Sequence, residues 1–313
     1  MLPGSRLNDL GGHGAVERYG WNRTRTYAVG ALALAALVAG CGGAAPEVPS
    51  GPPTGGAGSQ SASRPPAPPR TDPATPAADA AVAVWTKWNL KPLPPAPAPP
   101  ADKPLKLTAT GAVPVFSEVP TSDKVVFVTL DDGAEKDPRF VEMLTDLKVP
   151  VSMFLTRDIV KNDYGYFKPL KALGNHIHNH TTDHPAMSTK PADVQKSEVC
   201  DAQSALTQQY GVAPMLFRPP YGDGAHTAAL NTAVQQCGPR AIVLWRESMQ
   251  IHDMQYQAAD KKLKPGDIIL AHFRGPKDLK GETMTQMFGE LLSRIQEQGF
   301  AVARLEDYIK PPA

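Results

Sequence analysis

The stretch Val-Val-Phe-Val-Thr-Leu-Asp-Asp-Gly at residues 125–133 decides the fold. Its apolar run predicts a buried strand, and the run ends in two adjacent acids, Asp131 and Asp132. Two like charges at a strand end repel each other and lose hydration, so a cation, a proton or a structured loop must compensate them. One interpretation is a metal site in which one acid is a ligand and the other a base. The alternative is an ordinary turn in which Asp caps the next helix.

Outward from this strand, apolar segments alternate with amphipathic ones. We expect helices over 138–147, 166–173, 191–210, 227–236 and 283–298, and further strands over 151–155, 176–180, 215–217, 241–245, 267–271 and 301–305. Such alternation predicts an α/β fold with a mostly parallel sheet of six or seven strands, for which a barrel is as plausible as an open sheet. The carboxyl ends of the strands then gather the functional side chains, which are Asp131, Asp132, His180 and His272.

A second motif, His-Thr-Thr-Asp-His at 180–184, places two histidines four residues apart. This spacing puts both imidazoles on one face, which suits a metal, although such a pair is also common among surface residues. One Asp, two His and an open position for water form the ligand set of a hydrolytic zinc-type site. Strand alternation also puts His178 on the face of His180, so a ligand set containing His178 is a competing hypothesis.

Two further motifs follow strands. Arg-Pro-Pro-Tyr-Gly at 218–222 presents Arg218 and Tyr221 from a stiff loop, or is simply a proline-rich turn. Ile-Ile-Leu-Ala-His at 268–272 delivers His272 at a strand end, where a lone histidine is more often structural than catalytic.

The amino terminus has the pattern of an export signal. Arg18, Arg23 and Arg25 precede the apolar run 27–39, and Val-Ala-Gly-Cys at 38–41 resembles the lipobox of bacterial lipoproteins. We therefore expect residues 1–40 to be removed and Cys41 to carry a lipid. That lipid would anchor the protein to the outer face of the cell membrane, reaching into the wall. A plain signal peptide or an uncleaved anchor is the alternative.

Composition separates a tether from a globular part. Residues 42–105 hold 17 of the 33 prolines, so we expect residues 41–112 to form a Pro/Ala/Gly-rich tether without a core. Its apolar segment near 80–90, with Trp85 and Trp88, either docks on the outside of the domain or stacks on glycan. Residues 113–313 are long enough for one catalytic domain, which we expect to be a monomer. Without residues 1–40 the net charge is about −1, which argues against nucleic-acid binding.

The chain carries two cysteines besides Cys41. Cys200 and Cys237 lie on successive expected helices, and an exported chain meets oxidising conditions, so we expect a disulfide. Two buried free thiols on unconnected helix faces are the alternative.

Together, Thr-Leu-Asp-Asp-Gly at 129–133, the 180–184 motif, Arg-Pro-Pro-Tyr at 218–221 and Leu-Ala-His at 270–272 resemble the ordered motifs of the polysaccharide deacetylases. This family is carbohydrate esterase family four, with its NodB homology domain. The resemblance covers roughly residues 122–310 and implies a distorted (β/α) barrel of about seven strands. The activity it implies is metal-assisted removal of acetyl groups from an acetylated polysaccharide.

The resemblance also assigns roles to individual residues. It implies one divalent metal, Zn²⁺ or else Co²⁺, Ni²⁺ or Mn²⁺. It implies that Asp132, His180 and His184 are the metal ligands, that Asp131 is the general base and that His272 is the general acid. Arg218 would orient Asp131, and Tyr221 would supply an N–H to the oxyanion hole. Pro220, Tyr221 and Trp245 would contact the substrate.

Two stretches depart from the family pattern. The family usually has an Asp three residues after the aromatic residue that ends the strand over 241–245, but Ser248 stands at that spacing after Trp245. We expect Glu247 to approach Arg218 in place of the missing Asp and to support catalysis. His176 and His178 replace the usual Glu and Gly, and we expect His176 in the core and His178 behind the metal ligands.

From the motifs and the resemblance, a wall or extracellular polysaccharide de-N-acetylase is the first hypothesis. A catalytically weakened glycan-binding lipoprotein and an O-acetyl xylan esterase are the alternatives.

Overall fold

The structure is a computed structural model that describes residues 76–312, with side chains from residue 82 onward. The expected signal peptide, Cys41 and residues 42–75 of the expected tether lie outside these residues. Within them, no helix is long and apolar enough to cross a membrane.

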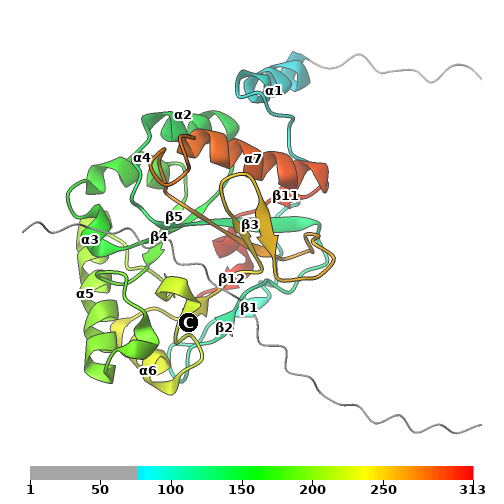
Figure 1. Cartoon of the computed structure of the whole chain (residues 1–313). Coiled ribbons are helices and arrows are strands. Elements are labelled where there is room, and N and C mark those ends of the chain that lie inside the picture. Colours follow the sequence, from blue (N-terminus) through cyan, green and yellow to red (C-terminus); the bar gives the residue numbers. More distant parts are fainter. Residues whose placement is uncertain (1–75, 313) are drawn as a thin grey trace, which may run out of the picture. The chain divides into compact units, whose positions relative to one another are not determined.

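Strands and helices alternate along most of the described chain, as the sequence predicts (Figure 1). The strands are β1 (Leu105–Lys106), β2 (Val115–Phe116), β3 (Val125–Asp132), β4 (Ser152–Leu155), β5 (His176–Asn179), β6 (Leu216–Phe217), β7 (Ala241–Val243), β8 (Glu247–Met249), β9 (Met254–Tyr256), β10 (Ile268–His272), β11 (Ala301–Val302) and β12 (Ile309–Lys310). The helices are α1 (Pro76–Lys87), α2 (Pro138–Leu147), α3 (Arg157–Val160), α4 (Phe167–Ala172), α5 (Ala192–Tyr210), α6 (Ala228–Cys237) and α7 (Met284–Glu297). The 3-10 helices are η1 (Tyr164–Tyr166), η2 (Met187–Thr189), η3 (Pro220–Gly222) and η4 (Leu305–Tyr308).

The expected helices match the observed ones closely because their ends carry local signals. Asp137 accepts a hydrogen bond from the backbone N–H of Arg139 at the start of α2, and Pro138 occupies its first turn. Thr283 and Gln286 form a capping box that begins α7. The helix α1 and the short strands of the β8–β9 hairpin were not predicted.

The main sheet has the order β2-β7-β6-β5-β4-β3-β10-β8-β9, with β11 paired to the beginning of β3. Neighbouring strands are parallel except for β8 and β9, so the prediction of a mostly parallel sheet is confirmed. The sheet has ten strands rather than about seven. A separate parallel pair joins β1 to β12.

The sheet curls into an incomplete barrel. β7 ends at Val243 near one end of the strand order and β8 begins at Glu247 near the other, yet four residues span at most about 14 Å. The two ends must therefore approach each other. An antiparallel bridge between Glu118 and Asp267 joins the chain after β2 to the start of β10. The expected distorted barrel is confirmed.

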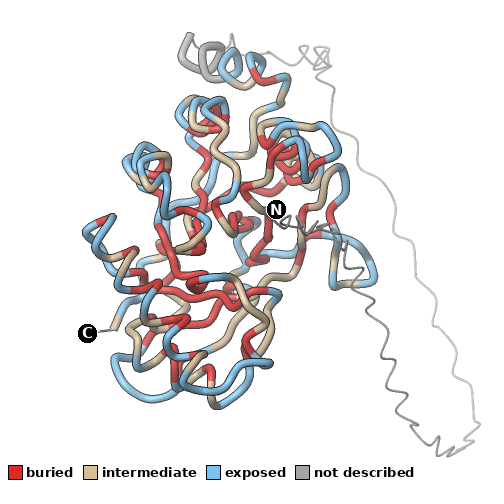
Figure 2. Tube along the Cα trace, turned by 60° about the vertical axis from the view of Figure 1, so that its left-hand side comes forward, coloured by how far each residue is buried: buried red, intermediate tan, exposed pale blue. Residues whose placement is uncertain are grey.

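Both faces of β3 are buried, which explains its continuous apolar run. Buried residues gather at the centre of the described chain and exposed ones at its periphery (Figure 2). One face, with Val126, Val128 and Leu130, packs into the cluster that includes the buried residues of α2 and α7. The other face, with Val125 and Phe127, belongs to the cluster inside the curled sheet. Strand alternation therefore sends Asp131 inward, on the face of Phe127.

The apolar segment near 80–90 docks on α2. The Trp88 side chain is only 8% exposed, and its indole N–H donates to Asp146 Oδ2 at 2.9 Å. Lys87 forms ion pairs with Asp146 at 2.6 Å and with Glu142 at 2.8 Å. Arg139 lies 5.0 Å over the Trp88 ring, so this ring is covered rather than offered to a glycan. Because β1 also joins the fold, the expected boundary at Val113 is too late.

Cys200 on α5 and Cys237 on α6 form the expected disulfide, with their Cα atoms 4.7 Å apart. Replacing both by Ser should lower the free energy of unfolding by about 3–4 kcal/mol, because the bridge closes a loop that restricts the unfolded chain. Urea denaturation without reductant would measure the loss. Dithiothreitol should shift the wild-type midpoint similarly and leave the double variant unchanged. Equal midpoints for the two proteins would contradict the prediction.

Candidate functional site

The end of β3 brings two adjacent carboxylates to one place. Side chains alternate along a strand, so Asp131 and Asp132 would ordinarily point to opposite faces. Asp132 instead has a positive φ of 73° and Gly133 one of 84°. A Cβ on Gly133 would lie 2.5 Å from Val160 Cγ1, so this turn requires glycine in packing as well as in backbone conformation. The turn redirects Asp132 toward the histidines that follow β5.

The two motif histidines meet Asp132. His184 Nε2 lies 3.2 Å and His180 Nε2 lies 3.5 Å from Asp132 Oδ1. His180 Nδ1 lies 2.7 Å from the backbone carbonyl of Arg218, to which it donates, so its Nε2 is left available as a ligand. The burial of His180 favours its neutral form, but Asp131 and Asp132 outweigh this and raise its pKa.

Asp132, His180 and His184 fit a divalent metal. Their ligand atoms all lie within 4.8 Å of one another, and Asp132 Oδ1 is buried without a hydrogen-bond partner. Burial opposes ionisation of Asp132, yet His180 and His184 hold its pKa well below the ordinary value. One carboxylate and two imidazoles are a ligand set typical of zinc. The structure thus brings together the three residues that the sequence predicts as ligands.

The two histidines of β5 itself, His176 and His178, lie outside the ligand cluster. His178 is 1% exposed, and its Nε2 lies 2.7 Å from Glu306 Oε1, a partner that also accepts from Ser152. It therefore contacts an acid of the barrel interior rather than supporting a metal ligand, and the expectation for it is wrong. His176 is exposed at the start of the strand, so its expected place in the core is also wrong.

Arg218 and Asp131 form a buried ion pair. Arg218 is fully buried, and its Nη1 donates to Asp131 Oδ1 at 2.6 Å and to Thr129 Oγ1 at 2.8 Å. Its Nε donates to the carbonyl of Val243, and its guanidinium lies 4.2 Å from the Phe154 ring centroid. These four contacts hold the Arg218 guanidinium in place, and it in turn holds Asp131.

Glu247 does not approach Arg218, so this prediction is wrong. Glu247 begins β8, in register with Ile269 of β10, and its carboxyl group lies beside that of Asp267. Glu247 is buried in this position. The prediction placed Glu247 just beyond the end of the 241–245 strand, beside Arg218. β7 instead ends at Val243, and the chain crosses to β8, near the other end of the strand order, where Glu247 lies.

The Glu247–Asp267 pair predicts a pH dependence of stability. Burial and the neighbouring Asp267 raise the pKa of Glu247 from 4.5 to about 9. The folded state then keeps a proton that the unfolded state loses, so this stabilisation is complete below about pH 4.5 and is lost as pH rises toward 9. Glu247→Gln should be increasingly more stable than wild type between pH 6 and 9, by up to about 1.4 kcal/mol per pH unit.

Urea denaturation across this pH range would measure the difference, and turnover should stay at the wild-type level. Glu290→Gln, which removes an exposed carboxylate of α7, serves as the control and should show no such trend. A constant difference between Glu247→Gln and wild type would contradict the assignment of the proton to this pair.

Loop residues surround the metal-ligand cluster. Tyr221 has a positive φ of 62°, is 50% exposed, and packs its ring 4.8 Å from that of His184. Pro220, the preceding residue, is buried, and Trp245 is half-buried, 5.6 Å from the Arg218 guanidinium. These three expected substrate contacts therefore lie near the cluster.

His272 ends β10 in register with Asp131. Burial lowers its pKa to about 4, although Asp132 and Asp131 act in the opposite direction. A cavity of about 110 Å³ adjoins it. The cavity combines apolar and polar side chains, which besides His272 are Met249, Gln250, Ile251, Arg274, Asp278, Leu279 and Met287.

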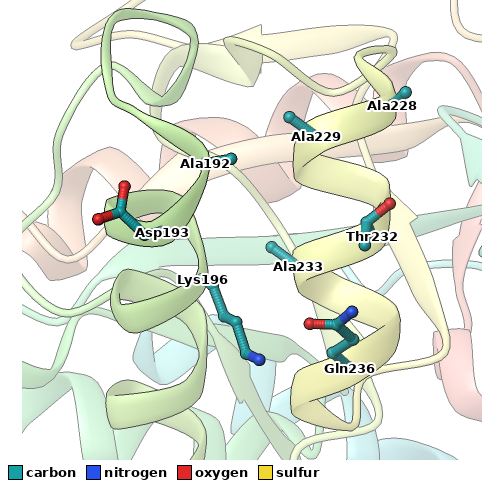
Figure 3. Close-up of a pocket in the computed structure, with 8 residues that line it drawn as sticks. All are labelled: Ala192, Asp193, Lys196, Ala228, Ala229, Thr232, Ala233 and Gln236. Carbon is teal, nitrogen blue, oxygen red and sulfur yellow. The ribbon is translucent and has the colours of Figure 1, made fainter.

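A larger groove of about 470 Å³ lies apart from these residues, between α5 and α6 (Figure 3). Ala192, Ala229 and Ala233 face it, with Lys196 and Gln236 toward one end. It contains none of the expected ligands or catalytic residues, so we do not assign it to the site.

Sequence reasoning missed several supporting residues. Thr129 stands in the decisive stretch, but nothing in its spacing indicates that it accepts from Arg218. Phe154 supports the guanidinium from β4. Glu198 lies in the middle of α5 and accepts backbone hydrogen bonds from the 180–184 turn. An acid among polar helix residues carries no signal of such a contact.

Comparison with known proteins agrees with the fold and the motifs. The family model described as polysaccharide deacetylase matches residues 118–242. An uncharacterised protein of Streptomyces coelicolor is 37% identical over 197 residues, which are 63% of this chain and 77% of that protein. A peptidoglycan-N-acetylglucosamine deacetylase of Bacillus cereus is 24% identical over 202 residues, covering 62% of this chain and 92% of the relative.

A solved structure shares the fold. The CE4 family pseudoenzyme from Bacillus anthracis has a TM-score of 0.52 and 19% identity, over 64% of this chain and 70% of that one. The matching family model and the Streptomyces relative together show that the chain belongs to the polysaccharide deacetylase family.

Proposed function

We propose that this protein is a metal-dependent hydrolase that removes acetyl groups from N-acetylated sugars of a cell-wall polysaccharide. The observation that carries the proposal is the Asp132, His180 and His184 cluster, with the Arg218-paired Asp131 directly beside it. The Bacillus cereus relative, a peptidoglycan-N-acetylglucosamine deacetylase, supports this class of substrate.

In the proposed mechanism the two acids at the end of β3 have different roles, Asp132 as a metal ligand and Asp131 as the general base. A divalent metal held by Asp132, His180 and His184 would polarise the acetyl carbonyl and acidify the attacking water. Asp131 accepts the proton of this water, and Arg218 keeps the carboxylate aimed at it. The adjacent acids thus serve different steps because their surroundings differ.

His272 would protonate the amine that leaves. Its lowered pKa means that the imidazole is neutral at pH 7 in the resting site, so it would take up a proton from solvent during the reaction and pass it to the leaving nitrogen. Negative charge developing on the acetyl oxygen would favour that protonation. The apolar part of the cavity beside His272 offers room for the acetyl methyl group.

We also propose that the protein is exported and tethered by a lipid on Cys41. The support is the pattern of residues 1–41, in which a charged segment and an apolar run precede a small pair and a cysteine. The proline-rich residues that follow would let the enzyme reach the wall. Metabolic labelling with a fatty acid analogue tests this, and Cys41→Ser should abolish the label.

A catalytically weakened, glycan-binding protein is the second candidate. It is favoured by the segment after Trp245, where Ser248 stands at the position of the usual acid. Glu247 does not replace that acid, because its carboxyl group lies beside Asp267 and not beside Arg218. Acetate release from peptidoglycan, chitooligosaccharide and acetyl-xylan would separate the candidates, with a chelator and then Zn²⁺, Co²⁺, Ni²⁺ or Mn²⁺ added back. Chelator-sensitive release from the first two substrates supports the proposal, and release only from acetyl-xylan indicates the esterase. Glycan binding without any release would overturn the enzyme hypothesis in favour of the second candidate.

A further inference from the structure

The turn that carries the two histidine ligands has an unfavourable backbone. Thr181 has a φ of 70° and His184 one of 66°, a left-handed backbone conformation that residues other than glycine rarely adopt. A turn of this kind persists only when its surroundings hold it in place. The contacts around residues 181–184 therefore determine where the His184 imidazole lies.

One side of the turn is held through its carbonyl groups. Thr181 O accepts from the backbone N–H of Arg157 at 3.1 Å, and Thr182 O accepts from that of Asp158 at 2.9 Å. Within the turn, the backbone N–H of His184 donates to Thr181 Oγ1 at 3.1 Å. These bonds leave the amides of the two central residues to be satisfied from elsewhere.

Glu198 satisfies both central amides. Its Oε2 accepts from the backbone N–H of Thr182 at 3.0 Å and from that of Asp183 at 3.1 Å. Its own carbonyl also accepts from Thr182 Oγ1 at 3.1 Å. Glu198 is only 8% exposed, so water cannot easily replace the carboxylate. The disulfide at Cys200, two residues further along α5, fixes the helix that presents it.

We propose that Glu198 is a positioning residue that holds the 181–184 turn in its left-handed conformation and thereby sets the affinity of the metal site. It is not a member of the ligand cluster, so it acts through the backbone of the turn. Without it, Thr181 and His184 can relax toward an ordinary backbone, and His184 Nε2 moves away from Asp132. The inference rests on the proposed function insofar as the turn supplies two metal ligands.

The role of Glu198 does not depend on its charge. The pKa of Glu198 is raised, mainly by burial and also by the neighbouring Asp183, although the two amide hydrogen bonds act in the opposite direction. An oxygen of the side chain accepts from the amides in either protonation state. Glutamine keeps one such oxygen and alanine keeps none, so Glu198→Gln should retain much of the function that Glu198→Ala loses.

The test measures Zn²⁺ affinity directly, by competition with a chromogenic chelator, for the full chain and its variants. Glu198→Ala should weaken binding by about 10–100-fold, the range for loss of an outer-shell partner, and Glu198→Gln by only several-fold. Asp201→Ala, which removes an exposed acid from the same helix, is the matched control and should bind as wild type does. Circular dichroism identifies which variants are folded.

Hydrogen exchange provides a second readout that needs no metal. The Thr182 and Asp183 amides should be protected in wild type and in Asp201→Ala, less so in Glu198→Gln, and exchange rapidly in Glu198→Ala. If Glu198→Ala does not fold, Glu198→Gln decides the question through its affinity and the exchange of these two amides.

A folded Glu198→Ala that binds Zn²⁺ as tightly as wild type would overturn the inference, as would unprotected Thr182 and Asp183 amides in wild type. Failure of the wild type itself to bind Zn²⁺, Co²⁺, Ni²⁺ or Mn²⁺ would instead overturn the proposed function. The exchange measurement would then still decide whether Glu198 holds the turn.

Discussion

Alanine in place of His180 or His184 should leave a folded protein that no longer retains a divalent metal and no longer releases acetate. Each substitution removes one of three ligands whose binding atoms lie within 4.8 Å of one another. Two remaining ligands cannot hold the ion in a fixed geometry. The loss of affinity should therefore exceed the roughly 10–100-fold typical of an outer-shell partner.

Equilibrium dialysis followed by metal analysis would measure retention, with His176→Ala as the matched control. His176 lies on β5, the strand that leads into the 180–184 turn, but it is exposed and outside the ligand cluster, so its removal should change affinity little. His178→Ala should also keep the metal, while destabilising the fold because it leaves the buried Glu306 without its imidazole partner. Equal metal loss in all four variants would show that the ligand assignment is wrong.

Asp131→Asn should separate catalysis from metal binding. Asparagine has nearly the same shape and keeps an oxygen for Arg218, but it cannot accept the proton of the attacking water. Turnover should fall by about 10²–10⁴-fold, the usual contribution of a general base. Metal affinity should stay within a few-fold of wild type, because Asp131 lies outside the proposed ligand set.

The neighbouring Asp132→Asn provides the contrast, since it should lose the metal and the activity together. Acetate release and metal retention measured on the same preparations distinguish the two variants. Asp131→Asn also weakens a buried ion pair, so thermal unfolding must show that the variant is folded at the assay temperature. Full turnover in a folded, metal-loaded Asp131→Asn would exclude Asp131 as the base.

Local patterns were sufficient for much of this molecule. The apolar run of β3, the periodicity of α2 and α7 and their capping residues predicted these elements and their order. Parallel strands bring their carboxyl ends to one edge, which is why acids and histidines far apart in sequence could be expected together. The sequence thus predicted the three-residue cluster of Asp132, His180 and His184, and also the disulfide between α5 and α6.

Contacts between distant elements could not be predicted in this way. Glu247 follows β7 closely in sequence, but the chain crosses to the other end of the strand order, and Glu247 meets Asp267 instead of Arg218. His178 finds Glu306, which lies 128 residues further along the chain. These partners depend on how the sheet curls, a property of the whole strand order.

The sequence by itself determined which elements form, which strand ends carry chemistry and which residue types can bind a metal, because periodicity, capping and strand direction are local or follow from parallel pairing. The tertiary structure decided how those side chains are aimed. Packing of Gly133 against Val160 accompanies the left-handed turn that redirects Asp132, and Glu198 of α5 holds the turn that presents His184. Both turns use backbone conformations that an isolated segment would seldom adopt, so their stability comes from contacts that exist only in the folded protein.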